Sequence, residues 1–227
     1  MDLKLFFAPG SCSRVPMIAL EEIGQPFSTH LVAFMKGEHK SPEYLAMNPA
    51  GKVPLLIADG QPIAQNPAIH VFLARSFPQA GLLPLGGNPL DEARVLGHLA
   101  WFSGDLHPLV TRIRIPAFAC DAAPERVKEQ AIEAMTGQLR PLDSVLSGQQ
   151  WILGETWSAL DAYLFWVWTR ISGAGFDASQ FPHIAAHYDH MNERPAVQRA
   201  IAREDEAQAD LEARGLAPSF ALAGPGR

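Results

Sequence analysis

The order of strand-like and helix-like segments is the feature of this sequence that most restricts its fold. Residues 3–7 (LKLFF) are typical of a short buried strand, and VPMIALEEI is typical of a helix that ends at Gly24. A strand over FSTHLVAF, a short helix over SPEYLAMN, a hairpin of PLLIA and QPIA around Asp59-Gly60, and a helix over PAIHVFLARSF follow. The order βαβ and then ββα predicts a mixed four-stranded sheet with helices on both faces.

The rest of the chain has helical patterns. The segment PLDEARVLGHLAWFSGDLHPLVTRI predicts one long helix with a kink at Pro108, and PERVKEQAIEAMTGQLRPLDSVL predicts its antiparallel neighbour. Apolar residues at helical spacing around Tyr163 indicate a buried core helix. A polar terminal helix over PAVQRAIAREDEAQADLEARG and a tail over residues 216–227 complete the prediction.

These patterns divide the chain into two domains. We predict an α/β domain over residues 1–78 and an all-helical domain over residues 89–227. Between them, residues 79–88 (QAGLLPLGGN) are rich in glycine, proline and leucine, which indicates a linker.

Composition narrows the class of protein. The net charge of −6 gives no electrostatic reason to expect nucleic acid or an anionic membrane as a partner. Two cysteines, Cys12 and Cys120, are too few for a disulfide framework, which favours a reducing compartment. The start of the chain is too short and too broken for a signal peptide, and the most apolar stretch, residues 163–168, is far below the ~18 residues that span a bilayer. We therefore expect a cytoplasmic protein.

Cys12 lies where the first strand turns into the first helix. The free N–H groups and the dipole of a helix N-terminus favour a thiolate, so Cys12 is a candidate thiolate or hydrogen-bond donor that meets another sulfur. The alternative is a small buried residue that packs the corner. Because no second cysteine lies two or three residues away, a dithiol cycle is excluded, and a monothiol site needs an external thiol.

Two further segments belong with this corner. Proline at a strand start, as in Val53-Pro54, often marks a cis bond, which would turn the Val53 backbone toward a peptide-like ligand beside Cys12. The alternative is an ordinary trans turn. Asn66 is a good N-cap and Pro67 a good first-turn residue, so this helix N-terminus either holds a carboxylate or is simply capped. The layout is that of a thioredoxin-like domain.

Together these segments resemble the cytosolic glutathione transferases. The resemblance covers nearly the whole chain and rests on FAPGSCS, NPAGKVP, QNPAIHVFLA and SALDAYLF; the last contains a capping box of Ser158 and Asp161. The PGSCS start and the DLH at residues 105–107 are most similar to the bacterial beta class, which places a cysteine where Cys12 stands. The resemblance implies an N-terminal thioredoxin-like domain followed by an all-helical domain.

The resemblance implies roles for individual residues. Val53 would pair with the cysteinyl backbone of glutathione, and Gln65 and Asn66 would hold its γ-glutamyl end. Lys52 and Lys36 would contact the glycyl carboxylate or the rim of the site.

Two residues of the helical domain also match the class. His107 matches its histidine near the sulfur, and Asp105 matches an acidic residue that reaches the neighbouring subunit's site. The resemblance therefore also implies a homodimer.

The sequence departs from the family at three points. Gln65-Asn66 stands where the family usually has an acidic residue followed by Ser, Thr or Gly, and the loss of a charged hydrogen bond predicts about tenfold weaker glutathione binding. Pro108 stands where the class tends to have a lysine, which removes a cation from the sulfur pocket. Ser11 flanks Cys12, and other classes use a serine near this corner, so a serine is an alternative to Cys12 as the group that stabilises the sulfur.

The activity implied is attack of the glutathione thiolate on a small apolar electrophile, with no metal. The electrophile would occupy a pocket between the domains. Candidate walls, for each of which core packing is the alternative, are Phe7, Phe34, Trp101, Phe102, Ile113 and Trp168, together with His107.

Two other functions remain open on the sequence. The first is a glutathione-dependent thiol-disulfide oxidoreductase that uses Cys12 through a mixed disulfide, for which Cys12→Ser abolishes activity. The second is a non-catalytic module that binds a ligand or a protein on the same fold, favoured by Gln65-Asn66.

The remaining groups of histidine, cysteine and acidic residues give only weak indications of function. His183 and His187 have the i, i+4 spacing of a zinc site, but without further ligands we expect surface or capping roles. We expect no role for Cys120, and we expect the acidic run Glu204–Glu206 to be a solvated helix face.

Overall fold

A computed structural model of the protein describes residues 1–217, which form two compact units. Residues Met1–Leu83 and the described residues from Arg194 onward form unit 1, and residues Pro84–Glu193 form unit 2. The terminal helix, which the sequence analysis placed in the helical domain, thus clusters with unit 1. The predicted tail lies almost entirely outside the described residues.

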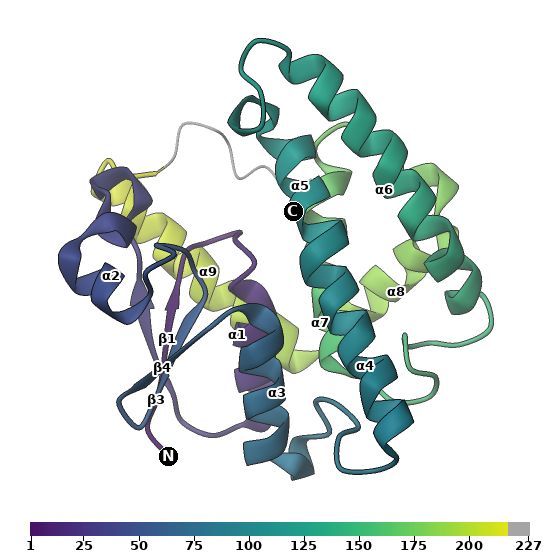
Figure 1. Ribbon diagram of the computed structural model, residues 1–227, viewed down its shortest axis with the longest axis horizontal. Coiled ribbons are helices and arrows are strands. Elements are labelled where there is room, and N and C mark those ends of the chain that lie inside the picture. The colour runs from purple at the N-terminus through teal and green to yellow at the C-terminus, as the bar shows by residue number, and fades with distance from the viewer. Residues whose placement is uncertain (218–227) are drawn as a thin grey trace. The chain divides into compact units, whose positions relative to one another are not determined.

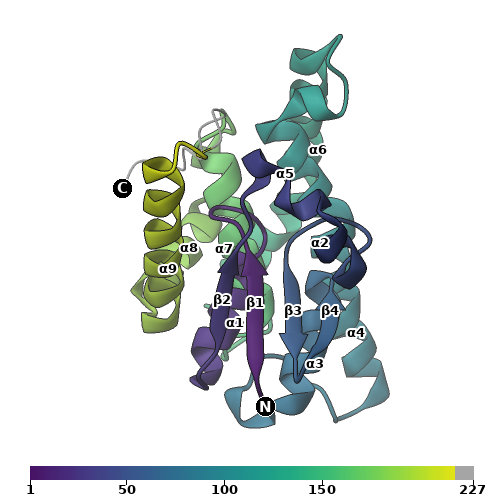
Figure 2. The same cartoon turned by 90° about the vertical axis from the view of Figure 1, so that its left-hand side faces the viewer.

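Unit 1 is built on a four-stranded mixed sheet. Its strands are β1 (Leu3–Phe7), β2 (Ser28–Leu31), β3 (Leu55–Ala58) and β4 (Gln61–Ala64). Figure 2 shows them side by side in the order β2-β1-β3-β4. Strand β1 pairs with β2 in parallel and with β3 antiparallel, and β3 and β4 form the hairpin. The predicted fold class, a thioredoxin-like domain followed by a helical one, is confirmed.

Four helices surround this sheet, namely α1 (Arg14–Ile23), α2 (Pro42–Met47), α3 (Asn66–Ser76) and α9 (Pro195–Ala213). Helix α1 ends where predicted, because Gly24 takes the left-handed conformation with φ of 72°. It packs against both α3 and α9 (Figure 1). On the other side, Tyr44 of α2 joins Phe6 and Leu55 in a hydrophobic cluster.

Strand β2 is shorter than the predicted FSTHLVAF. After Leu31 the chain enters a 3₁₀ turn over Phe34–Lys36 and a second over Glu38–Lys40. The carboxylate of Glu38 accepts the Ala33 N–H at 2.8 Å. Because a side chain takes this N–H, the backbone turns there instead of continuing as a strand.

Unit 2 contains five helices in its described part, namely α4 (Pro89–Trp101), α5 (His107–Arg114), α6 (Pro124–Leu146), α7 (Ala159–Ser172) and α8 (Pro182–Glu193). Figure 1 shows α6 alongside α5. The predicted long helix is interrupted by a π-helical turn over Phe102–Leu106, directly before the predicted kink. Pro108 lacks an N–H and its ring crowds the carbonyl of Gly104, so a wider turn at this point relieves both constraints.

Helix α7 is buried on nearly every side, as predicted, and its capping box is present. The Asp161 carboxylate accepts from the Ser158 N–H at 2.8 Å, the Ser158 hydroxyl at 2.9 Å and the Ile152 N–H at 2.9 Å. His187 Nε2 lies 2.9 Å from the same carboxylate, and both side chains are buried. Of the expected surface or capping role, the surface role is wrong for His187, because its side chain is buried against the capping-box residue Asp161.

Residues 1–217 contain neither a membrane-spanning helix nor a cluster of metal ligands. None of the helices there has the length and apolar character needed to cross a membrane. Nor does that part of the chain bring together three or more His, Cys, Asp or Glu side chains in an arrangement suited to a metal ion.

Candidate active site

The corner between β1 and α1 is held by its own serine hydroxyls. Ser11 Oγ donates to the Ala8 carbonyl at 2.7 Å and lies 2.5 Å from Ser13 Oγ. Ser13 is fully buried, and its Oγ also lies 3.2 Å from the Ala8 carbonyl. Both hydroxyl protons are used inside the turn, so the geometry favours a structural role for Ser11 over action on a bound sulfur.

Cys12 is a buried thiol, and only 7% of its surface is exposed. Its Sγ donates to the Val53 carbonyl at 3.6 Å. Burial raises the pKa of the Cys12 thiol to about 12, although its own backbone N–H, the Asn66 amide and the charge of Lys52 act in the opposite direction. Desolvation thus opposes the predicted thiolate form of Cys12. The other predicted role, a hydrogen-bond donor, agrees with a protonated thiol.

The Val53-Pro54 peptide bond is cis, and the segment before it is held by α2. The Lys52 carbonyl accepts both the Tyr44 hydroxyl at 2.8 Å and the Asn48 Nδ2 amide at 2.7 Å. Burial raises the pKa of Tyr44 to about 12, so this donor stays protonated. Sequence reasoning missed Tyr44 and Asn48. Their signal was the i, i+4 spacing, with Tyr44 on the short helix and Asn48 at the start of NPAGKVP.

The start of α3 completes this part of unit 1. Asn66 is buried, and its Nδ2 donates to the Cys12 carbonyl at 3.1 Å. Within residues 1–217 its Oδ1 is buried without a hydrogen-bond donor. Asn66 is therefore the first helical residue and not the predicted N-cap, because its amide is turned toward Cys12. Gln65 takes the N-cap position, exposed and with a φ of 75°, a conformation that costs energy in a residue other than glycine.

The other candidates in unit 1 differ in exposure. Lys36 and Lys52 are exposed, as a contact with a ligand carboxylate requires. Phe34 is half-buried and lies edge-on to His39, with ring centroids 4.7 Å apart. Phe7 is 3% exposed in the core of the unit, so packing accounts for its position.

Several of the candidates in unit 2 pack within that unit. His107 Nδ1 lies 3.2 Å from the Tyr163 hydroxyl. Phe102 is fully buried and stacks on Tyr163 with ring centroids 5.2 Å apart, which assigns it to the core. Ile113 and Trp168 are also buried. Trp101 donates its Nε1–H to Gln138 at 2.8 Å, and Asp105 is exposed.

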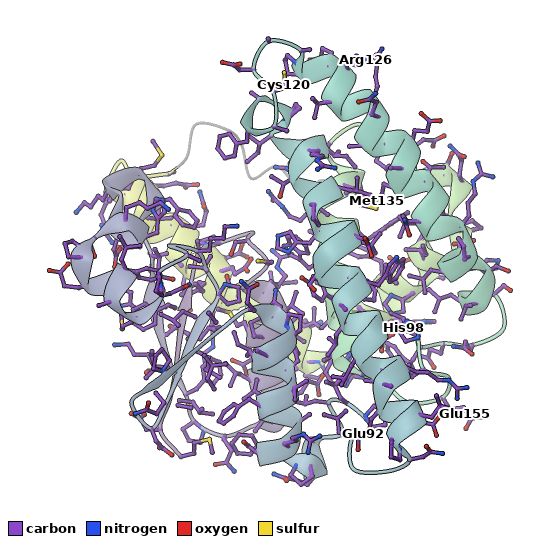
Figure 3. The ribbon with its side chains drawn as sticks, viewed as in Figure 1. Glu92, His98, Cys120, Arg126, Met135 and Glu155 are labelled. Atoms are coloured by element: carbon purple, nitrogen blue, oxygen red, sulfur yellow. The ribbon has the colours of Figure 1, made fainter. Side chains whose placement is uncertain are left out.

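Cys120, for which we expected no role, is exposed in the connection that follows the 3₁₀ turn over Pro116–Phe118, before α6 (Figure 3).

Glu204 of α9 also belongs to the corner, and sequence reasoning missed it. This carboxylate is 3% exposed, and its Oε2 accepts the Gly10 N–H at 3.0 Å and the Arg14 guanidinium at 2.6 Å. The expectation of a solvated acidic run is therefore wrong for Glu204, whereas Asp205 and Glu206 are exposed. The signal was its spacing from Ala200, Ala207 and Leu211, which places it on the buried stripe of α9.

Comparison with known proteins gives a family match over most of the chain. Residues 1–75 match the family described as "Glutathione S-transferase, N-terminal domain", and residues 101–195 match "Glutathione S-transferase, C-terminal domain". The chain is 34% identical over 205 residues to the glutathione S-transferase GstA of Escherichia coli O157:H7, covering 89% of this chain and 98% of that protein.

Solved structures agree with this match. A sphingomonad glutathione S-transferase complexed with glutathione is 31% identical, with a TM-score of 0.78 over 89% of this chain and 98% of that chain. The bacterial beta class enzyme of Sphingomonas chungbukensis is 30% identical, with a TM-score of 0.78 over 88% and 98% of the two chains.

Proposed function

Because this chain belongs to the glutathione S-transferase family and is a glutathione transferase, we propose that it joins the sulfur of glutathione to small apolar electrophiles. The observation that carries the proposal is the meeting of three elements in unit 1. The Cys12 thiol lies 3.6 Å from the Val53 carbonyl, and the Asn66 amide lies 3.1 Å from the Cys12 carbonyl. A peptide-like thiol can therefore contact the strand edge, the helix start and the thiol together.

Each end of glutathione has a chemical partner in this arrangement. The backbone of Val53 pairs with the cysteinyl residue, and Pro54 follows it directly before strand β3. The γ-glutamyl end is held at Gln65 and Asn66, where the exposed side chain of Gln65 is the acceptor that its ammonium group can reach. The exposed ammonium groups of Lys52 and Lys36 meet the glycyl carboxylate.

Cys12 acts in this mechanism as a donor and not as a nucleophile. Burial favours the protonated thiol, so its S–H can leave the Val53 carbonyl and donate a hydrogen bond to the sulfur of bound glutathione. This bond favours the thiolate form of glutathione, whose thiol proton passes to solvent. A sulfur electron pair then forms the new C–S bond, and the leaving group departs with the electron pair of the bond that breaks.

The remaining roles follow the family resemblance. His107 and Trp101 in unit 2 are proposed as contacts of the electrophile, and Asp105 as an acidic residue that reaches the site of a neighbouring subunit. A second copy of the chain is the proposed partner, and α4 carries apolar side chains suited to it, with Leu90 57% and Leu96 41% exposed.

Removal of the Cys12 thiol tests this mechanism. We expect Cys12→Ser to keep conjugation within about threefold of the parent, since its hydroxyl still donates. Cys12→Ala loses the donor, and we expect a fall of about threefold to tenfold, which corresponds to one hydrogen bond. The measurement is kcat/KM with a chlorodinitrobenzene substrate at pH 7, with Cys120→Ser as the matched control.

The same variants separate the other two functions in an exchange assay with a mixed disulfide of glutathione. If exchange is rapid in the parent and abolished in Cys12→Ser, while conjugation is absent from both, the protein is the thiol-disulfide oxidoreductase. If glutathione binds and neither reaction occurs, the binding-module hypothesis takes its place.

A further inference from the structure

We propose that Glu204 is a positioning residue that holds the corner carrying Cys12 in place. The proposal deepens the function above and rests on it where glutathione turnover is concerned. Glu204 lies on α9, far from the corner in sequence, and its Oε2 contacts groups on both sides of Cys12.

The first contact is to the backbone before the cysteine. Gly10 lies two residues before Cys12, adopts a φ of 67°, and donates its N–H to Glu204 Oε2 at 3.0 Å in a buried bond. A charged acceptor makes this a stronger bond than a carbonyl would make. Removal of the carboxylate therefore weakens the hold on the turn that leads into Ser11 and Cys12.

The second contact is to the helix after the cysteine. Arg14 lies two residues past Cys12 and begins α1. Its Nε and Nη2 lie 3.0 Å and 2.6 Å from the same Glu204 oxygen, and 12% of the arginine side chain is exposed. One carboxylate thus holds the chain on either side of the thiol, and this contact resists an outward movement of Cys12.

Glu21 provides a matched comparison within the same pair of helices. It is also a buried carboxylate between α1 and α9, and it accepts Arg199 Nε and Arg203 Nε at 2.6 Å each. It lies in the last turn of α1, away from the corner. Glu21 therefore serves the docking of α9 alone, whereas Glu204 serves both the docking and the corner.

The rate at which iodoacetamide alkylates Cys12 tests the proposal without glutathione. All variants carry Cys120→Ser, so only Cys12 reacts. We expect slow alkylation at pH 8 in the parent, because the thiol is buried, and at least about tenfold faster alkylation in Glu204→Gln, which has an amide facing Arg14. Glu21→Gln is expected to stay within about twofold of the parent.

Three results decide the proposal. Equally faster alkylation of Cys12 in Glu204→Gln and Glu21→Gln would mean that Glu204 only docks α9, and unchanged alkylation in both would overturn the proposal.

If circular dichroism shows that Glu204→Gln does not fold, Arg14→Lys provides the test instead. This variant keeps the positive charge beside Glu204 and removes the fork of the guanidinium, and we expect alkylation about threefold faster than in the parent. An unchanged rate in that variant would also overturn the proposal.

Glutathione kinetics give the second readout. In Glu204→Gln we expect KM for glutathione to rise several-fold, with a smaller change in kcat, because the corner is no longer preorganised. Glu204→Asp keeps the charge and is expected to recover part of the loss. If the protein has no glutathione activity at all, the proposed function fails, while the alkylation rates still decide the role of Glu204.

Discussion

Asp161→Ala is expected to lower the free energy of unfolding by about 3–5 kcal/mol, the usual cost of removing one partner from a buried charged network. Asp161 is fully buried and accepts from two backbone N–H groups, one hydroxyl and the ring of His187. Alanine leaves all four donors without this acceptor at the start of α7. The measurement is urea unfolding followed by tryptophan fluorescence.

Asp189→Ala is the matched control, since Asp189 is exposed on α8 two residues past His187. We expect it to change stability by no more than about 0.5 kcal/mol. Asp161→Asn keeps the shape of the side chain but offers one acceptor oxygen in place of two. We expect its loss in free energy of unfolding to lie between those of Asp161→Ala and Asp189→Ala. A loss below about 1 kcal/mol in Asp161→Ala would show that the network does not hold unit 2 together.

Gly51→Ala is expected to destabilise unit 1 by about 2–4 kcal/mol, because it combines left-handed backbone strain with steric overlap. Gly51 has a φ of 58°, and a Cβ there would lie 2.8 Å from the carbonyl oxygen of His39. That oxygen belongs to the backbone, so it can move only slightly to relieve the overlap. Because Lys52 and Val53 follow directly, we also expect at least about tenfold weaker binding of glutathione.

Gly60→Ala is the control that introduces backbone strain without steric overlap. Gly60 has a φ of 80°, but a Cβ there would meet no atom within 4 Å. We expect it to show only the strain, about 1–2 kcal/mol, with glutathione binding unchanged. Calorimetric titration and thermal unfolding of both variants provide the measurement. Equal effects of the two substitutions on glutathione binding would contradict the role assigned to the chain around Gly51.

Local sequence signals were enough to predict the sheet and most helices. The hairpin is an example: Asp59-Gly60 between two apolar runs predicts a tight turn, and both residues have the required positive φ, 46° and 80°. The strand that was predicted too long shows the limit of such patterns. Glu38, several residues further on, takes the Ala33 N–H, and nothing in FSTHLVAF itself signals this.

The predictions about site residues that failed have one physical cause. Whether a residue is buried depends on which segments, distant in sequence, cover it. Cys12 lies in the predicted corner, but its protonation depends on how deeply the rest of the unit covers it. From the sequence, Glu204 is predicted to be one of three solvated acids, and only the packing of α9 against α1 shows that it is buried. His187 is likewise predicted to lie on the surface, and only its contact with Asp161 shows otherwise. Such contacts join residues too far apart in sequence for periodicity to reveal.

Calorimetric titration of the parent protein and of Gln65→Glu with reduced glutathione tests the central claim most directly. We predict that the parent binds with Kd in the roughly micromolar to millimolar range, and that Gln65→Glu binds about tenfold more tightly, because a carboxylate at this exposed position can pair with the γ-glutamyl ammonium. Binding by neither protein would contradict the claim that unit 1 holds glutathione.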